Sequence, residues 1–310
     1  MNLKTLASII IPTFNRAHLI VETLESILNQ TYSNWECIVV DDNSEDDTDN
    51  VLRKFINNDT RFKYFKRPVN RHKGANACRN YGLELSQGDV IIFFDSDDLM
   101  TAEHVELKVN NIIHHNVDYV ITRTQYFNAE NTEIDKNYKF HLNGITVENY
   151  ITQKVNWLTL DVAIISDLAK KISFNEQLQS GQEYNYFCKL VLHSVNAKFI
   201  DKVVSLRRSH EGSIRAKIDS KDKFYSSQFN KLWYTYYDTK HMVVKSLKLH
   251  WMRTCVNYVY DLKKIPTTSK QKFYQAVFNE FGTRGFYFVI MMGCLKIFGK
   301  GYIFKRLLFK

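Results

Sequence analysis

The first hundred residues alternate between short apolar runs and longer stretches with helical spacing. Four runs are rich in valine, isoleucine and phenylalanine: ASIII (7–11), CIVVD (37–41), FKYF (62–65) and VIIFFD (90–95). The first, second and fourth are almost continuously apolar, which is typical of strands covered on both faces. Between the runs, apolar residues such as Ile20, Leu24 and Ile27 recur at helical spacing. This alternation predicts an α/β fold with a parallel sheet and helical crossovers.

Beyond residue 119 the pattern is less regular. It predicts strands over 118–122 and within 155–165, a loop over 128–150, a helix over 180–194 and a hairpin over 197–209. The remainder of the chain has helical spacing and many aromatic residues, which suit either packing or stacking on sugars.

A change of pattern near residue 215 divides the chain into two predicted regions. The first, 1–215, contains the strand–helix alternation, with one half over about 1–100 and the other over about 101–215. The second, 216–310, is predicted to be helical, basic and aromatic. A chain of 310 residues is long enough for one large domain with such an extension.

Charge and cysteine usage limit the partners and the compartment. The formal net charge of +9 favours an anionic partner, such as nucleic acid, a membrane surface or a phosphorylated ligand. The five cysteines are odd in number and include no Cys-x-x-Cys pair, so we expect neither a disulfide framework nor a zinc site, but a reducing compartment. The first apolar stretch ends at Pro12, too early for a signal peptide, and no run of about 20 apolar residues predicts a transmembrane helix. We therefore expect a cytoplasmic protein.

Acidic side chains follow the fourth apolar run, in the sequence DSDD (95–98). Asp95 and Asp97 are two positions apart, which on a regular strand places both on one face. They lie at the carboxyl end of a predicted parallel strand, where ligands bind in open α/β sheets. Oxygen-only ligands suit a hard cation such as Mg²⁺ or Mn²⁺. The alternative is a solvated turn in which Asp98 or Thr101 caps the following helix.

A second acidic stretch, DDNSEDDTDN (41–50), follows the second apolar run. It lacks the turn glycine and the final glutamate of a calcium-binding loop, so most of its acids are expected to favour the N-terminus of a helix that begins near Thr48. Asp41 differs because it lies at the strand end. Its carboxylate can accept a hydrogen bond from a nucleobase N–H there.

A basic stretch follows the third run. Arg71, Lys73 and Arg79 surround a predicted helix start, and helix N-termini and guanidinium groups both bind phosphate. A basic solvated face is the alternative. No Gly-x-Gly-x-x-Gly motif or P-loop is present, which argues against a dinucleotide dehydrogenase and a P-loop enzyme. In haloacid-dehalogenase phosphatases the Asp-x-Asp motif normally ends the first strand of the domain, whereas here it ends the fourth. This difference argues against a phosphatase of that class.

Six stretches together resemble, in order, the signatures of family 2 glycosyltransferases: SIIIPTFNR, CIVVDDNSEDDT, NACRNYGLELSQGD, IIFFDSDD, SGQEYNYFCKL and RRSHEGSI. The resemblance covers about residues 6–215 and leaves the C-terminal third without a match. It implies the GT-A nucleotide-diphospho-sugar transferase fold, with a mainly parallel central sheet flanked by helices. The C-terminal third is then expected to be a helical extension.

The resemblance implies an inverting transfer of a sugar from a nucleotide-diphosphate donor to an acceptor hydroxyl. UDP is the expected nucleotide, because it is frequent in the family, and the expected group is hexosyl or N-acetylhexosaminyl. The expected acceptor is a lipid-linked glycan or oligosaccharide of a bacterial surface polysaccharide, such as capsule or O-antigen, and no nucleic acid is expected. The residues leave two alternatives, a nucleotidyltransferase and a non-enzymatic basic binding module. The first would need a glycine-rich basic loop after the first strand, and the second has no use for Asp-x-Asp.

The resemblance also assigns residues that bind the donor. Pro12, Thr13 and Asp41 would line the nucleobase pocket. Asn70 and Arg79 would approach the ribose or the diphosphate. These assignments make the carboxyl edge of the predicted sheet the nucleotide-sugar site.

The remaining implied residues concern the metal and the catalytic base. Asp95 would face the ribose or the metal, and Asp97 would bind the metal, a Mn²⁺ or Mg²⁺ ion. His210 would be a further metal or diphosphate ligand, or else a surface histidine. Glu183 stands where the family usually has the aspartate that acts as base, and Gln182 replaces the acid before it. The alternative for Glu183 is that it only favours the N-terminus of its helix.

The last 27 residues, 284–310, contain six basic residues and no acid, mixed with many large apolar groups. The apolar run 286–295 is too short to span a bilayer. It can lie in the membrane interface with its lysines towards anionic lipid, which predicts peripheral attachment to the inner face of the cell membrane. The alternative is an ordinary core helix packed on the first domain.

Overall fold

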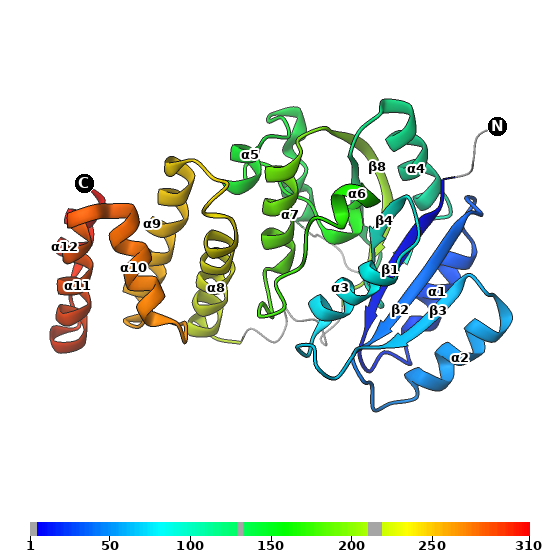
Figure 1. The fold of residues 1–310 in the computed structure, drawn as a ribbon, viewed down its shortest axis with the longest axis horizontal. Helices are drawn as coiled ribbons and strands as arrows, with labels where there is room; N and C mark the ends of the chain where they lie inside the picture. Colours follow the sequence, from blue (N-terminus) through cyan, green and yellow to red (C-terminus); the bar gives the residue numbers. More distant parts are fainter. Residues whose placement is uncertain (1–4, 129–132, 210–218) are drawn as a thin grey trace. The chain divides into compact units, whose positions relative to one another are not determined.

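The computed structural model describes residues 5–128, 133–209 and 219–310 of the chain (Figure 1). The chain divides into two compact units. The first comprises Met1–Gln179 and Lys189–His210, and the second comprises Ser180–Cys188 and Glu211–Lys310. Each unit is described by itself below.

The first unit is built on an eight-stranded sheet with the order β3-β2-β1-β4-β7-β6-β8-β5. Its strands are β1 (Ala7–Thr13), β2 (Trp35–Asp41), β3 (Phe62–Lys66), β4 (Val90–Phe93), β5 (Leu99–Met100), β6 (Tyr119–Tyr126), β7 (Val162–Ile165) and β8 (Ala197–Arg207). β1 to β4 are parallel to one another, and β6 is parallel to β8. β7 pairs antiparallel with β4 and β6, and β5 pairs antiparallel with β8. The four strands predicted in the first hundred residues and the mainly parallel sheet are confirmed.

Helices cover the two faces of this sheet, and the residue pattern explains which face each helix takes. Alternate strand residues such as Ile9, Val39 and Ile92 share a core with α1 (Ile20–Leu28), α2 (Thr48–Asn58) and α4 (His104–His115). The intervening residues Ile38 and Val40 pack instead with Cys78 of α3 (Ala75–Leu85). Because side chains alternate across a strand, continuously apolar strands are buried on both faces.

One close approach fixes how α3 lies on the sheet. A Cβ atom built on Gly82 would lie 2.5 Å from Cγ2 of Ile10 and 3.4 Å from Cγ2 of Val40. Only glycine lets the helix backbone come this near to β1 and β2. The consequence is that α3 holds its polar N-terminal half at the carboxyl edge of these strands.

The predicted hairpin over 197–209 is wrong. The segment forms one continuous strand, β8, which pairs in parallel with β6 and antiparallel with β5. The register shifts between Ile121 and Thr124 of β6, so a bulge absorbs the polar pair Asp201–Lys202 that suggested a turn. The sequence has no glycine or asparagine there to support a tight turn.

The segment between β6 and β8 contains mostly short elements. They are η1 (Glu133–Asn137), η2 (Lys139–His141), α5 (Val147–Ile151), η3 (Thr159–Asp161) and α6 (Ser166–Ala169). The strand predicted within 155–165 is therefore shortened to β7, and the predicted loop over 128–150 contains helical turns. The helix predicted over 180–194 is confirmed as α7 (Gln182–His193), whose residues are divided between the two units.

A buried polar network lies beneath α4. Nζ of Lys108 donates to the Leu160 carbonyl at 2.6 Å and lies 2.9 Å from Nε2 of His104, whose Nδ1 lies 3.0 Å from the Val204 carbonyl. Nearby, the carboxylate of Asp161 accepts hydrogen bonds from Thr124, Tyr138 and the Leu158 N–H. Burial lowers the pKa of Lys108 to about 7 against the attraction of Asp161.

The second unit is helical, as predicted. It contains α8 (Lys221–Thr239), α9 (Lys245–Leu262), α10 (Lys270–Phe281), η4 (Gly282–Arg284), α11 (Gly285–Phe298) and α12 (Tyr302–Phe309), coloured from yellow to red in Figure 1. The rings of Phe229, Trp233 and Phe288 all contact Phe273 at centroid distances of 5.1 to 5.7 Å, and all four are buried. Packing therefore accounts for much of the aromatic density of this region.

Candidate active site

The parallel strands β1, β2 and β3 end side by side. Thr13, the last residue of β1, is in register with Asp41, the last residue of β2, and Asp41 is in register with Lys66 at the end of β3. β4 pairs with β1 and is followed by Asp95, two residues beyond its end at Phe93. Four strand ends thus bring polar side chains to one edge of the sheet, where ligands bind in folds of this class.

A buried ion pair joins α3 to the residues after β4. Nη2 of Arg79 donates to Oδ1 of Asp95 at 2.6 Å, and the Arg79 side chain is almost fully buried. Its guanidinium carbon lies 5.3 Å from the centre of the Phe174 ring. Nε of Arg79 has no hydrogen-bond partner among the described residues. The guanidinium therefore has a buried N–H group without an acceptor close to the edge of the sheet, and an anionic oxygen such as that of a phosphate would satisfy it.

The three acids after β4 point to different partners. Asp97 lies 3.6 Å from Nε of Arg16, in the loop after β1, whereas Oδ1 of Asp98 accepts a hydrogen bond from the backbone N–H of Arg208 at 2.8 Å. The expectation that Asp95 and Asp97 share one face of a strand is wrong, because β4 ends at Phe93 and Asp97 lies in a turn. The turn directs the three acids to different partners instead of aligning them on one face of a strand.

The alternative function predicted for Asp98 and Thr101, capping the next helix, is also wrong. α4 begins at His104 after Glu103, and no side chain caps it. Asp98 is buried and bound to Arg208, and the hydroxyl of Thr101 has no partner in the described part of the chain. Asp98 therefore belongs to the acidic cluster rather than to a helix end.

The acids after β4 have the oxygen-ligand chemistry of a hard divalent cation site, although the described side chains are not arranged to hold one. The described residues include no group of three or more His, Cys, Asp or Glu side chains arranged to hold a metal ion. However, burial, together with the negative charges of Asp95 and Asp97, raises the pKa of Asp98 well above its usual value. Three mutually repelling carboxylates are the oxygen ligands that Mg²⁺ and Mn²⁺ prefer. The likeness to a cation site lies in this chemistry alone, since Asp95 pairs with Arg79 and Asp97 lies near Arg16.

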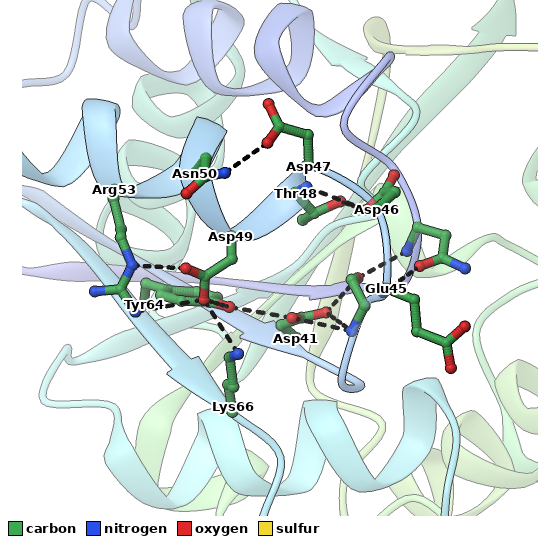
Figure 2. A network of polar contacts seen from close by, with 12 residues as sticks. Asp41, Glu45, Asp46, Asp47, Thr48, Asp49, Asn50, Arg53, Tyr64 and Lys66 are labelled. Carbon is green, nitrogen blue, oxygen red and sulfur yellow. Dashed lines mark hydrogen bonds and ion pairs between the residues drawn. The ribbon is translucent and has the colours of Figure 1, made fainter.

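Asp41 lies at the centre of a polar network, shown in Figure 2. Its carboxylate accepts hydrogen bonds from the backbone N–H and the hydroxyl of Ser44, at 3.0 and 2.5 Å. The hydroxyl of Tyr64 lies 3.1 Å from Asp41 and 2.8 Å from Asp49, so it bridges the two acids. Asp41 has no exposed surface. A nucleobase reaches its carboxylate only if the loop that carries Ser44 moves.

The other acids of residues 41–50 hold this loop and the start of α2, which begins at Thr48 as predicted. Asp46 accepts hydrogen bonds from the backbone N–H groups of Ala17 and Thr48, which ties the loops after β1 and β2 together. Asp49 pairs with Arg53 and Lys66 (Figure 2), and these partners, Arg53 first, hold its pKa well below the usual value. Asp46 and Asp49 therefore already have hydrogen-bond or ion-pair partners within the protein.

The other residues assigned to the donor are placed as follows. Pro12 and Thr13 are buried at the end of β1, and the Thr13 hydroxyl has no hydrogen-bond partner within the described ranges. Asn70 is exposed in the turn before α3. Of the basic residues near α3, Arg71 pairs with Glu84 at 2.5 Å, while Nζ of Lys73 lies 4.5 Å from the centre of the exposed Phe14 ring.

The expected base, Glu183, and the third expected metal ligand, His210, do not belong to the described part of the first unit. Glu183 is half-buried in the first turn of α7 and belongs to the second unit, as does Gln182. The predicted position at a helix start is confirmed for Glu183. His210 lies outside the described residues, so its predicted function as a ligand stays a prediction.

Three residues near the edge were not singled out in the sequence. Arg16 faces Asp97, Arg208 binds both the Asp98 carboxylate and the Asp97 carbonyl, and Phe14 presents a ring beside Lys73. Phe14 and Arg16 belong to PTFNR, directly after β1, so their position at a strand end was the available signal. Arg208 follows β8, and the antiparallel pairing of β8 with β5 brings it next to the acids between β4 and β5. The sequence did not predict that pairing.

Comparison with known proteins adds a family to this geometry. The model of the family described as glycosyl transferase family 2 matches residues 8–174. Over 217 residues the chain is 32% identical to the UDP-Glc:alpha-D-GlcNAc-diphosphoundecaprenol beta-1,3-glucosyltransferase WfaP of Escherichia coli, covering 68% of this chain and 80% of that protein. Three other relatives match at 36 to 38% identity, and the chain spans only 16 to 47% of their lengths.

Two solved structures share the fold. The Staphylococcus aureus protein TarS, residues 1–349, in complex with UDP-GlcNAc, aligns with a TM-score of 0.65 at 17% identity, over 98% of this chain and 89% of that one. The mannosyltransferase PcManGT from Pyrobaculum calidifontis, in complex with GDP-Man and Mn²⁺, aligns with a TM-score of 0.60 at 14% identity, over 99% and 85%. The expected GT-A fold is confirmed by these likenesses.

Proposed function

Because the chain belongs to glycosyl transferase family 2, we propose that it moves a sugar from a nucleotide-diphosphate donor to an acceptor hydroxyl, with inversion at the anomeric carbon. UDP is the favoured nucleotide, since the name of WfaP includes UDP-Glc and TarS was solved with UDP-GlcNAc. The name of WfaP also includes a diphosphoundecaprenol acceptor, which supports a lipid-linked glycan as the acceptor here. The product would then belong to a bacterial surface polysaccharide.

One observation carries this proposal. Asp95, Asp97 and Asp98 cluster at the carboxyl edge of the parallel strands, next to the buried guanidinium of Arg79 and its unused Nε–H donor. A donor diphosphate needs cationic and N–H groups, and a cation site needs carboxylates, so this edge offers both. The buried, unsatisfied Thr13 hydroxyl at the end of β1 supports a nucleobase pocket alongside, and Asp41 would be its second polar group once the loop that carries Ser44 moves.

Asp97 and Asp95 are the residues that would hold the divalent cation, Mn²⁺ or Mg²⁺, and His210 is proposed as a further ligand. When bound, the cation supplies positive charge that neutralises the diphosphate leaving group. Arg79 would bind the diphosphate from the side of α3, and Asn70, exposed before the same helix, would approach the ribose. The Mn²⁺ in the PcManGT structure supports this cofactor.

Glu183 is proposed as the general base. The acceptor oxygen attacks the anomeric carbon, the bond from that carbon to the diphosphate oxygen breaks, and the nucleoside diphosphate leaves with the bonding electrons. The acceptor proton passes to the Glu183 carboxylate as the new bond forms. The position of Glu183 in the first turn of α7, where the side chain is half-buried, supports this function, because a regular helix holds the carboxylate in a defined place.

The proposed location is the cytoplasm, with peripheral attachment to the inner face of the membrane that contains the acceptor. The absence of a nucleic-acid partner is part of the same proposal, since the acidic cluster would repel a phosphate backbone unless a cation intervenes.

Ligand-induced stabilisation tests the donor without knowledge of the acceptor. We expect UDP-glucose or UDP-N-acetylglucosamine, with Mn²⁺, to raise the melting temperature, because a ligand that binds only the folded state stabilises it. GDP-mannose serves as the competing donor. The slow release of UDP by hydrolysis of the bound donor, measured in the same samples, reports the reaction itself.

A matched pair of variants makes this test specific. Asp97→Asn should lose both the Mn²⁺-dependent shift and UDP release, whereas Asp167→Asn, an exposed aspartate at α6, should behave as the wild type. If no nucleotide sugar raises the melting temperature, the proposed function is wrong. If EDTA leaves UDP release unchanged, the sugar transfer stands and the metal assignment is wrong.

A further inference from the structure

α11 has apolar residues on two faces, although a surface helix usually has one. Phe288, Met291 and Leu295 are buried in the second unit. A second stripe, at spacings of three, four and eleven residues, is exposed: Phe286 (64% exposed), Val289, Ile290 and Ile297 (73%). Several large apolar side chains that are exposed next to one another mark an interaction surface.

α12 extends this surface. Gly299 has a positive φ of 68° and ends α11, and a Cβ on Gly301 would come within 3.1 Å of the Met291 carbonyl oxygen, so the turn between the helices is tight. Leu308 is buried, whereas Tyr302 and Ile303 (64%) are exposed just after the turn. The exposed apolar end of α11 and the exposed apolar start of α12 are therefore joined by three residues (Figure 1).

The same two helices are strongly basic. The segment 284–310 contains six basic residues and no acid, a formal charge of +6 within a chain of net charge +9. Lys296, Lys300, Arg306 and Lys310 are exposed around the apolar stripe. Lys305 differs, because its Nζ lies 4.2 Å from the centre of the Tyr260 ring of α9. Cations that surround a strip of phenylalanine and isoleucine match anionic headgroups around acyl chains.

We propose that the exposed residues of α11 and α12 form a peripheral binding surface for an anionic lipid bilayer. The surface comprises Phe286, Val289, Ile290, Lys296, Ile297, Phe298, Lys300, Tyr302, Ile303 and Arg306 and is called the α11–α12 surface below. The choice of a membrane rests on the proposed function, whose acceptor is lipid-linked. A second copy of the chain is disfavoured as the occupant, because the three basic residues of one such face would meet the same three of the other.

The helix lengths indicate that α11 lies in the interface and does not cross the bilayer. Residues Lys270–Phe298 have the length and mean hydropathy, 1.3, of a membrane span. However, α10 ends at Phe281, Gly282 has a φ of 60°, and a short 3-10 turn separates the two helices. α11 alone has 14 residues, about 21 Å of helix, against about 30 Å of hydrocarbon. The buried residues Phe288, Met291 and Leu295 also keep one face of α11 packed within the second unit.

Vesicle flotation of the full chain tests the proposal without donor, acceptor or metal. We expect the protein to float with phosphatidylcholine vesicles that contain phosphatidylglycerol, to float poorly with phosphatidylcholine alone, and to be released by high ionic strength. Lys296→Gln with Lys300→Gln should weaken binding about tenfold or more, since each lysine near an anionic surface contributes a factor of about five. Ile297→Ser with Ile303→Ser should reduce it by a similar factor.

Matched controls use exposed residues of the first unit. Val69→Ser with Leu142→Ser, at positions 93% and 69% exposed, should float as the wild type. All variants should keep the wild-type melting temperature, because each changed side chain is exposed. Failure to float with anionic vesicles, equal flotation of the α11–α12 variants, or a dimer in sedimentation velocity that Ile297→Ser dissociates would each overturn the proposal.

The two proposals fail separately. The α11–α12 variants should keep the melting-temperature shift that UDP-sugars and Mn²⁺ produce, because none of them lies at the sheet edge. A protein that binds UDP-sugar and ignores vesicles retains the proposed function and loses the membrane surface. A protein that binds anionic vesicles through α11 and α12 and ignores every nucleotide retains the surface and loses the function.

Discussion

Nη2 of Arg79 donates to Oδ1 of Asp95 at 2.6 Å, and the pair connects the buried face of α3 to the first acid after β4. The two residues are 16 positions apart in sequence, one in α3 and the other just after β4 at the carboxyl edge of the sheet. In the absence of a ligand this pair keeps the charge of Asp95 compensated. It also places a guanidinium where a diphosphate would enter.

Arg79→Gln should therefore impair donor binding. The substitution removes the charge that balances Asp95 and the proposed phosphate donor, and we expect kcat/KM for UDP release to fall about 10- to 100-fold. Arg53→Gln, which removes an exposed arginine paired with Asp49 on α2, is the matched control and should change little. Equal activity of the two variants would contradict the function given to Arg79.

Glu183→Gln should separate binding from turnover. Without the carboxylate the acceptor proton has no base, so we expect kcat for transfer to fall about 10²- to 10⁴-fold while the UDP-dependent melting shift is retained. Glu183→Asp, which restores the acid usual in the family, should keep a measurable part of the rate. Normal turnover by Glu183→Gln would show that Glu183 only favours the start of α7.

The buried Lys108 should give the protein a distinctive dependence of stability on pH. Burial lowers its pKa from 10.5 to about 7 in the folded state, although the negative charge of Asp161 acts in the opposite direction. Between those values the unfolded chain binds a proton that the folded protein does not, so the cost of burying this group decreases as pH rises from about 7 towards 10.5.

Lys108→Met removes this titration. We expect the free energy of unfolding of the wild type, relative to the variant, to increase by about 1 to 2 kcal/mol between pH 7 and pH 9. Urea denaturation of both proteins at the two pH values measures it. The comparison cancels the titration of cysteines and tyrosines, which both proteins share. A constant difference across this range would mean that Lys108 stays protonated.

Gly82→Ala should destabilise the first unit. The new Cβ would lie 2.5 Å from a methyl group of the fully buried Ile10, so α3 must move away from β1, at a cost of about 1 to 3 kcal/mol. Gly293→Ala, also within a helix, meets no described atom within 4 Å and should stabilise by about 0.5 to 1 kcal/mol. Opposite signs in thermal denaturation are the expected result, and a stabilising Gly82→Ala would refute the close approach.

Local pattern was enough to predict most of the first hundred residues. β1, β2 and β4 are apolar on both faces, and a strand of that kind has few alternatives to a parallel, helix-covered position. The helical character of the C-terminal region followed from spacing in the same way. Local pattern failed at β8, where Asp201 and Lys202 resembled a turn, because the partner strands β5 and β6 lie far away in sequence.

The sequence by itself determined that polar residues follow the apolar strands, that Glu183 starts a helix, and that residues 284–310 are basic and apolar. Only the tertiary structure decided which acids pair with which arginines, because β4 ends before Asp95 and the turn directs each acid to a different element. It also decided which apolar residues of α11 are covered. A helix with two apolar faces can bury either one, and the choice depends on the neighbours that pack against Phe288 and Met291, and not on the helix itself.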